Sequence, residues 1–80
     1  MSGAFLGNAD LSGTDLHKAS LALANLSGAN LSRANLLEVN LTNANFSGAN
    51  VESARFGNNP GLTEEVKVNL QQRGGIFEEV

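Results

Sequence analysis

Few side chains in this sequence are of a type that could do chemistry, and none stands at a spacing that favours it. His17 is the only histidine, and a histidine without a second histidine, a cysteine or an acid cluster does not make a metal site. Asp10 and Asp15 could in principle serve as an acid–base pair, but they occupy the same slot of a repeated pattern, which favours a structural role. We therefore predict that the protein is not an enzyme and has no catalytic, cofactor-binding or metal-binding residues.

Nucleophilic catalysis and phosphate binding are not indicated either. A nucleophilic serine needs a base placed to activate it, and the sequence positions no such base. The glycines are scattered singly and form no phosphate-binding loop. The serines considered lie at variable slots of the repeated pattern: Ser12, Ser27, Ser32, Ser47 and Ser53.

Length and charge limit the classes of partner. Eighty residues allow one small domain, and without any cysteine no disulfide or thiolate metal site can stabilise it. The net charge of −3 argues against nucleic-acid binding, which calls for a basic surface. No apolar run approaches the roughly 20 residues of a membrane span, so we expect no membrane partner.

The N-terminal residues lack the basic and apolar regions of a signal peptide. This favours a cytoplasmic protein. The thylakoid lumen or the periplasm is the alternative if the chain is a processed form.

Residues 4–58 are organised as eleven consecutive five-residue repeats. The central residue of each repeat is Leu, Phe or Val, and the first is Ala in nine of the eleven. A period of five leaves no apolar stripe on an α-helix and no single apolar face on a flat strand. The chain must therefore bend once per repeat, which points every central residue into one shared interior. The predicted core is Leu6, Leu11, Leu16, Leu21, Leu26, Leu31, Leu36, Leu41, Phe46, Val51 and Phe56.

The other positions of the repeat have distinct expected roles. Position 1 shares a face with the central residue, because residues two apart in an extended segment point the same way. Position 2 is mostly Asn or Asp, points outward and bonds locally to the backbone. Its side chains could also stack into amide ladders between layers. Positions 4 and 5 are variable, point outward and are expected to tolerate change at little cost.

Repeats such as ANLSG, ANLSR and ADLSG match the A(D/N)LXX consensus of the pentapeptide repeat family letter for letter, and the chain resembles this family over residues 4–58. The resemblance implies an all-β solenoid, a right-handed quadrilateral parallel β-helix with four repeats per coil. Eleven repeats would then give just under three coils. Residues twenty apart would stack, at about 4.8 Å per layer.

The repeats end at Asn58, and residues 59–80 form a different unit. Asn59-Pro60-Gly61 indicates a turn, and Thr63 followed by two acids is typical of a helix start, so a helix is predicted over about 64–73. We expect this helix to cap the last coil, with binding of a partner as the alternative. The ending resembles the NPGL(S/T)…RG.IF ending of many cyanobacterial pentapeptide repeat proteins. The predicted capping residues are Leu62, Val66, Leu70, Ile76 and Phe77, packed over Val51 and Phe56, and the last residues, Glu78, Glu79 and Val80, are expected to fray.

Three apolar residues stand where the repeat calls for polar ones, and they are the candidate interaction residues: Phe5, Leu23 and Leu37. Phe5 replaces the Asn or Asp of position 2 in the first repeat. Met1-Ser2-Gly3 is too short to cover the first coil, and exposed strand edges invite pairing. A homodimer formed end to end through that coil is therefore one interpretation, and a plain exposed aromatic is the other. Leu23 and Leu37 are either ordinary exposed leucines or a small contact patch.

The sequence therefore predicts a non-catalytic structural or protein-interaction module whose protein partner is unknown. The resemblance raises one alternative, because some pentapeptide repeat proteins are long acidic rods that imitate DNA and protect topoisomerases such as gyrase. Four acids against three bases in residues 1–58 make a weak match to that role. A second alternative is that the chain is the C-terminal fragment of a longer solenoid.

Overall fold

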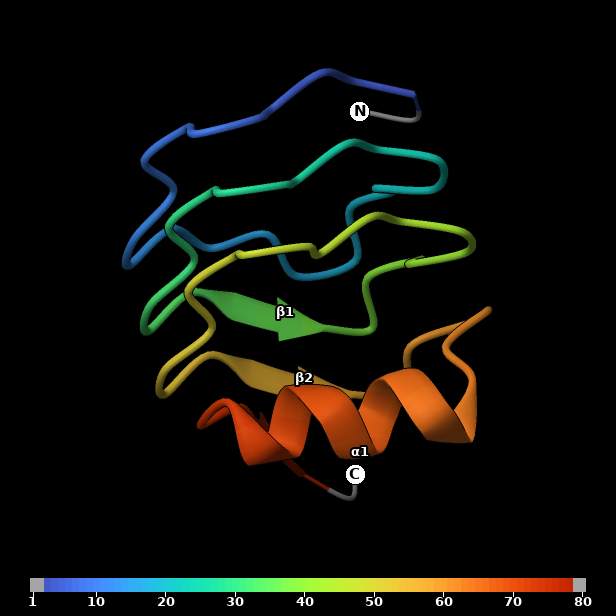
Figure 1. The fold of residues 1–80 in the computed structure, drawn as a ribbon. Coiled ribbons are helices and arrows are strands. Elements are labelled where there is room, and N and C mark those ends of the chain that lie inside the picture. The colour runs from blue at the N-terminus through green and yellow to red at the C-terminus, as the bar shows by residue number, and fades with distance from the viewer. Residues whose placement is uncertain (1–2, 79–80) are drawn as a thin grey trace.

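The structure, a computed structural model, describes residues 3–78. Figure 1 shows the chain winding in stacked layers, with a helix beneath the last of them. The three strands form one parallel sheet in the order β1-β2-β3. The regular elements are β1 (Asn35–Leu37), β2 (Arg55–Gly57), α1 (Glu64–Gln72) and β3 (Ile76–Phe77).

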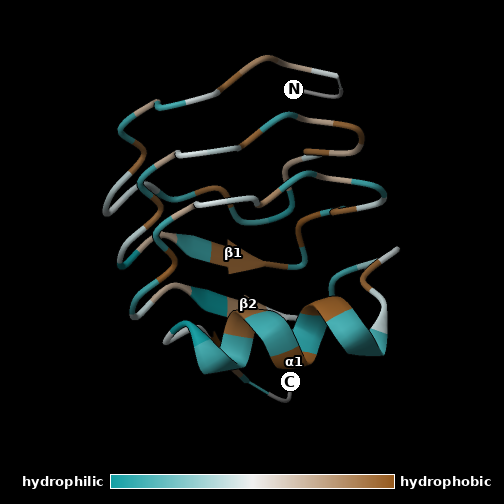
Figure 2. Ribbon diagram, in the orientation of Figure 1, coloured by the Kyte–Doolittle hydropathy of each residue, from teal (hydrophilic) through white to brown (hydrophobic). Residues whose placement is uncertain are grey.

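Parallel pairing between residues twenty apart relates each layer to the next. Isolated bridges join Asp10 to Asn30 and Asn30 to Asn50, and β1 pairs with β2 at the same offset. Because twenty residues are four repeats, each repeat lies on the repeat four earlier. Figure 2 shows hydrophobic and hydrophilic residues alternating along every layer. We call residues 4–23, 24–43 and 44–58 the first, second and third layers.

The interior holds the central residues of the repeats, although not all to the same depth. From Leu21 onward each central residue is at most 6% exposed. Leu6, Leu11 and Leu16 are only half-buried, so the prediction of eleven buried centres is wrong for these three. The reason is that no described repeat lies above them. Leu21 differs because the chain passes over its repeat, where the Gly3 N–H donates to the Ala22 carbonyl at 2.7 Å.

The fifth residue of every repeat adopts the left-handed backbone region. Its φ lies between +50° and +71° in all eleven repeats, eight of which carry a residue other than glycine there. A left-handed residue with a Cβ costs roughly 1–2 kcal/mol, and only Gly, Asn and Asp adopt the region readily. The expectation that position 5 tolerates change at little cost is therefore wrong. The signal in the sequence was Gly or Asn at six of the eleven fifth positions.

Leu23→Gly should raise the free energy of unfolding by about 1 kcal/mol. Leu23 holds φ at +61° while its side chain is 65% exposed, so strain is relieved and little packing is lost. The entropy of glycine in the unfolded chain offsets part of the gain. Urea denaturation measures the difference. The matched control is Ala22→Gly, outside the left-handed region, which should lower stability by roughly 0.5–1 kcal/mol. Equal effects of the two substitutions would contradict the strain argument.

The polar side chains of position 2 stabilise the turn of their own repeat. In eight repeats the Oδ1 atom accepts a hydrogen bond from the backbone N–H two residues later, at 2.9–3.1 Å, as between Asn30 and Ser32. The local bonding expected of Asn and Asp is thus present. Amide ladders between layers are absent from residues 3–78, because these oxygens are directed along their own chain.

Helix α1 begins as its sequence predicts and ends at Gln72. The Thr63 Oγ1 accepts from the Val66 N–H at 3.3 Å, and two acids occupy the first turn, where carboxylates suit the helix dipole. Leu70 is fully buried in the core. Leu62, Val66 and Phe77 are half-buried and pack against the same core.

Strand β3 places one of its two residues inward and the other outward. Phe77 stacks on Phe56, with ring centroids 4.9 Å apart and planes at 14°. Ile76 is 49% exposed, so its prediction as a capping residue is wrong: neighbouring residues of a strand point to opposite faces. Glu78 is held rather than frayed, since its Oε2 accepts from the Arg55 Nε at 2.6 Å. Glu79 and Val80 lie outside the described residues.

Candidate interaction surfaces

Three backbone hydrogen bonds recur wherever one repeat lies on another. The first repeat and the repeat beneath it show them. The N–H of Asn25, at position 2, donates to the carbonyl of Ala4 at 2.9 Å. The carbonyl of Asn25 accepts from the Leu6 N–H at 2.8 Å, and the carbonyl of Ser27 accepts from the Asn8 N–H at 3.0 Å. The outermost repeat at each end of the stack therefore has backbone groups whose usual partner, the next repeat of the ladder, is missing.

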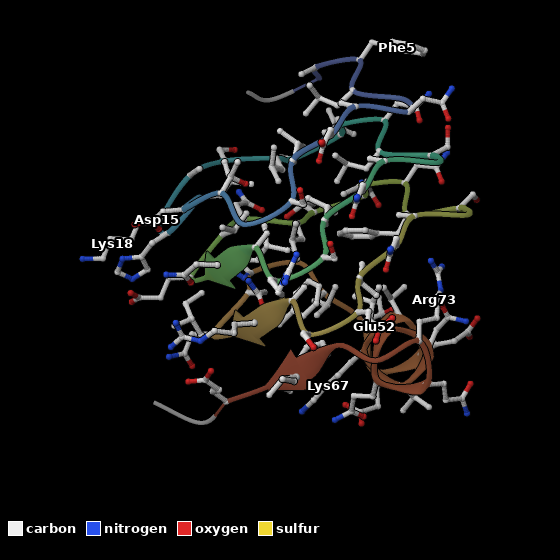
Figure 3. All side chains as sticks on the ribbon, turned by 90° about the vertical axis from the view of Figure 1, so that its left-hand side faces the viewer. Phe5, Asp15, Lys18, Glu52, Lys67 and Arg73 are labelled. Atoms are coloured by element: carbon white, nitrogen blue, oxygen red, sulfur yellow. The ribbon has the colours of Figure 1, made fainter. Side chains whose placement is uncertain are left out.

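The first layer exposes such groups along three of its repeats. The position 2 N–H and carbonyl groups of Phe5, Asp10 and Asp15 have no hydrogen-bond partner among residues 3–78. We call this set the N-terminal edge. The Phe5 side chain is 79% exposed, and its ring lies over Gly7. Figure 3 shows Phe5 projecting at the end of the stack opposite α1.

The other two candidate residues differ in exposure. Leu23 is 65% exposed in the turn that ends its own repeat. Leu37 is half-buried in β1, where its Cδ2 lies against Gly57 of the next layer. The expectation that Leu37 is exposed like Leu23 is therefore wrong, because the layer beneath covers it.

At the other end of the stack, side chains replace the missing strand. The Arg73 Nη1 donates to the carbonyls of Phe46 and Ala49 at 2.8 and 3.0 Å. The Asn59 Nδ2 donates to the carbonyls of Leu36 and Val39 at 2.8 and 2.9 Å. Figure 3 shows Arg73 beside the helix. Sequence reasoning placed Asn59 in a turn and Arg73 within the predicted helix, and it missed these bonds because the carbonyls lie twenty or more residues away in the chain.

Two pairs of charged residues and one serine–aspartate contact lie on the described surface. The His17 Nε2 lies 2.6 Å from the Glu38 Oε2, joining the first and second layers. The Ser12 hydroxyl and N–H donate to Asp10 and hold the pKa of that carboxyl below its usual value. Donation from Arg55 likewise lowers the pKa of Glu78. Within residues 3–78, no cluster of three potential ligands could hold a metal ion.

No described helix is long and apolar enough to cross a bilayer. Stacked parallel layers around an apolar interior define a β-solenoid, a class of repeat proteins. The model for pentapeptide repeats matches residues 1–28 and 19–58, with 8 copies, and the chain belongs to this family. Its members are non-enzymatic repeat proteins that fold as a right-handed β-helix.

Two solved structures are similar to this chain. A pentapeptide repeat protein from the Arabidopsis thaliana thylakoid lumen is 34% identical, with a TM-score of 0.67 over 95% of this chain and 57% of that one. A pentapeptide repeat protein from Nostoc is 27% identical, with a TM-score of 0.46 over 96% of this chain and 83% of that one. This chain thus spans 57% of the length of the Arabidopsis protein. No curated protein matches it.

Proposed function

We propose that this protein is a non-catalytic scaffold that binds a second copy of itself through the N-terminal edge. In this proposal residues 4–58 form just under three four-sided coils, and residues 59–78 cap the last coil. The two ends of the stack then have different roles. The C-terminal end is covered by the chain's own cap, and the N-terminal end binds a partner.

The single observation that carries the proposal is the unpaired N-terminal edge. It presents a row of backbone donors and acceptors that have no partner among residues 3–78, and such edges pair readily with another chain. The three half-buried leucines of the first layer lie directly beneath it. A second copy would cover this apolar surface together with the exposed ring of Phe5, and burial of apolar area favours association.

The cap is supported by contacts on three sides of the third layer. Leu70 fills the end of the interior, and Phe77 stacks on Phe56. Strand β3 continues the parallel sheet below β2. Polar side chains from the same segment satisfy carbonyls of the last two layers. Helix α1 thereby has a role within the molecule.

Phe5→Asp should convert a dimer into a monomer. Asp is a normal residue of position 2, and its carboxylate can accept from the Gly7 N–H, as Asp10 accepts from Ser12, so the fold should be retained. The substitution removes the exposed ring and adds a negative charge to each copy at the contact. Light scattering after size exclusion, at high protein concentration, measures the mass.

The matched control is Val68→Asp, which places the same charge on α1, at the end of the stack opposite the N-terminal edge, where Val68 is 41% exposed. It should leave the dimer intact. A wild-type protein that stays monomeric at high concentration rules out self-association through this edge. So does a dimer that Phe5→Asp leaves unchanged.

A further inference from the structure

A second incomplete strand edge lies at the opposite end of the stack, beside α1. The ninth repeat, residues 44–48, opens the third layer, and a groove of about 410 Å³ separates it from the helix. One wall of the groove is the repeat itself, which contributes Ala44, Asn45, Phe46 and Ser47. The other wall is α1, which contributes the apolar side chains of Val66 and Val68 and the acid Glu65.

Three backbone groups of this repeat lack a partner. The Ala44 carbonyl, the Phe46 N–H and the Gly48 N–H make no hydrogen bond within the described part of the chain. These are the groups at positions 1, 3 and 5 that point toward the C-terminal end of the stack. The groove therefore contains an acceptor followed by two donors, in the order that a parallel strand requires.

The repeat directly above shows what satisfies these groups. There the Ala24 carbonyl accepts from the Asn45 N–H at 2.9 Å, and the Leu26 N–H donates to the Asn45 carbonyl at 2.8 Å. The Gly28 N–H donates to the Ser47 carbonyl, also at 2.8 Å. The same three groups are thus paired one layer earlier and unpaired here.

The chain's own C-terminal segment does not fill this position. On the last side of the third layer it runs extended as β3, where the Ile76 N–H donates to the Ala54 carbonyl at 2.8 Å. Just before that strand, the carbonyl of Gly74, in the turn after α1, accepts from the Ser53 N–H at 2.9 Å. Below residues 44–48 the segment is helical instead. A helix uses its backbone groups internally, so α1 covers the interior without completing the ladder.

We propose that this groove binds an extended segment of a partner protein as an added parallel strand. One N–H of the segment would donate to the Ala44 carbonyl, and two carbonyls of the segment would accept from the Phe46 and Gly48 N–H groups. Strand addition of this kind takes its affinity from the main chain and its specificity from alternate side chains. The residue of the segment that donates to the Ala44 carbonyl is not proline. The residues of the segment that face Phe46 and Val66 are small or apolar.

The charge of the groove indicates one further property of the segment. Glu65 forms no ion pair within residues 3–78, whereas Arg73 is held by the Phe46 and Ala49 carbonyls and by Asn69. The Arg73 guanidinium is thus fixed in place, whereas the Glu65 carboxylate has no partner among these residues and can pair with a cation of a ligand. A basic residue that precedes the paired stretch would complement it. This surface is separate from the N-terminal edge, and the inference does not depend on the proposed self-association.

A peptide copying residues 32–38, SRANLLE, with both ends blocked, is a suitable probe. It is one repeat of this chain, preceded by an arginine. NMR of the 15N-labelled full chain should show shifts of the Phe46 and Gly48 amides. At ten times the dissociation constant, hydrogen exchange of both amides should slow about tenfold. The Leu26 and Gly28 amides should not change, because they are already paired.

The same peptide with Asn35→Pro is the matched ligand control, since proline lacks the N–H that would donate to Ala44. It should produce no shifts. On the protein, Val68→Arg obstructs the groove and repels the basic residue, so it should weaken peptide binding at least about fivefold. Gln71→Arg adds the same side chain on the other side of α1, facing a different groove, and should leave binding unchanged.

Three results would overturn the inference. The first is an absence of shifts at Phe46 and Gly48 with peptide at about 5 mM, a concentration at which even weak binding is visible. The second is equal binding of the proline peptide. Shifts confined to Phe5, Asp10 and Asp15 would also reject the groove, and they would place strand pairing at the N-terminal edge.

Discussion

Phe56→Ala should lower the free energy of unfolding by about 4 kcal/mol, a large share of the total for a domain of this size. The Phe56 ring is fully buried. It meets Phe46 edge to face, with centroids 6.4 Å apart and planes at 76°, and stacks on Phe77 on the other side. Alanine would leave a cavity between the third layer and β3, where neither neighbour can close the gap. Urea denaturation followed by circular dichroism measures the loss.

The matched control for this substitution is Phe5→Ala, which truncates the same side chain at a site that is 79% exposed. It should change stability by no more than about 0.5 kcal/mol. Phe56→Leu keeps most of the volume and should cost roughly 1.5 kcal/mol, so it remains measurable if the alanine variant does not fold. Similar losses for Phe56→Ala and Phe5→Ala would show that the last layer is not packed as described.

Asn59→Ala should cost about 3 kcal/mol, which is unusual for a polar residue near the surface. Its Oδ1 accepts from the Gly57 N–H at 2.9 Å, and its Nδ2 donates to two carbonyls of the second layer. In a regular ladder the Val39 carbonyl would accept from the backbone N–H of residue 60. Residue 60 is proline, which has no N–H. The Asn59 side chain therefore replaces a backbone donor. Truncation leaves the Gly57 N–H and the Val39 carbonyl without a partner, whereas the Leu36 carbonyl keeps its bond from the Val39 N–H.

Asn58→Gly is the neighbouring control. Asn58 has an exposed side chain and a φ of +50°, so glycine suits its backbone and the change should be under about 1 kcal/mol. A second comparison tests the mechanism directly. Adding Pro60→Ala to Asn59→Ala returns a backbone N–H to the ladder, and about 1 kcal/mol should be recovered. An Asn59→Ala loss below about 1 kcal/mol, or no recovery in the double variant, would contradict this account.

The two proposed contact surfaces follow from the same physical property as these stability predictions. A stack of parallel layers satisfies its backbone only in its middle, and each end needs donors and acceptors from elsewhere. Where Asn59, Arg73 and β3 provide them, the result is internal stability. Where nothing described provides them, at the N-terminal edge and beside residues 44–48, the result is a surface suited to another strand.

Much of the architecture could be predicted because the repeat constrains it so strongly. A large apolar residue at every fifth position, with Ala two positions earlier, excludes a helix and a flat strand and leaves a coil with one interior. The helix start at Thr63 was equally plain from its cap and the two acids that follow. Local hydrogen bonding by Asn and Asp at position 2 also follows from residue type alone.

Other features depend on what lies above or below a residue, and these could not be predicted from its own repeat. Leu16 and Leu36 stand at the same position of equivalent repeats, yet only Leu36 is fully buried, because it has a layer on both sides. Ile76 and Phe77 are both apolar, and the strand pairing of β3 decides which of them faces inward.

The sequence by itself determined the class of protein, its family, its apolar interior and the position of its helix, because each of these is encoded within one repeat or one helical turn. Only the tertiary structure decided which backbone groups stay unpaired and which polar side chains reach them. Those partners are about twenty or more residues apart in the chain, and the path of the chain around the stack brings them together.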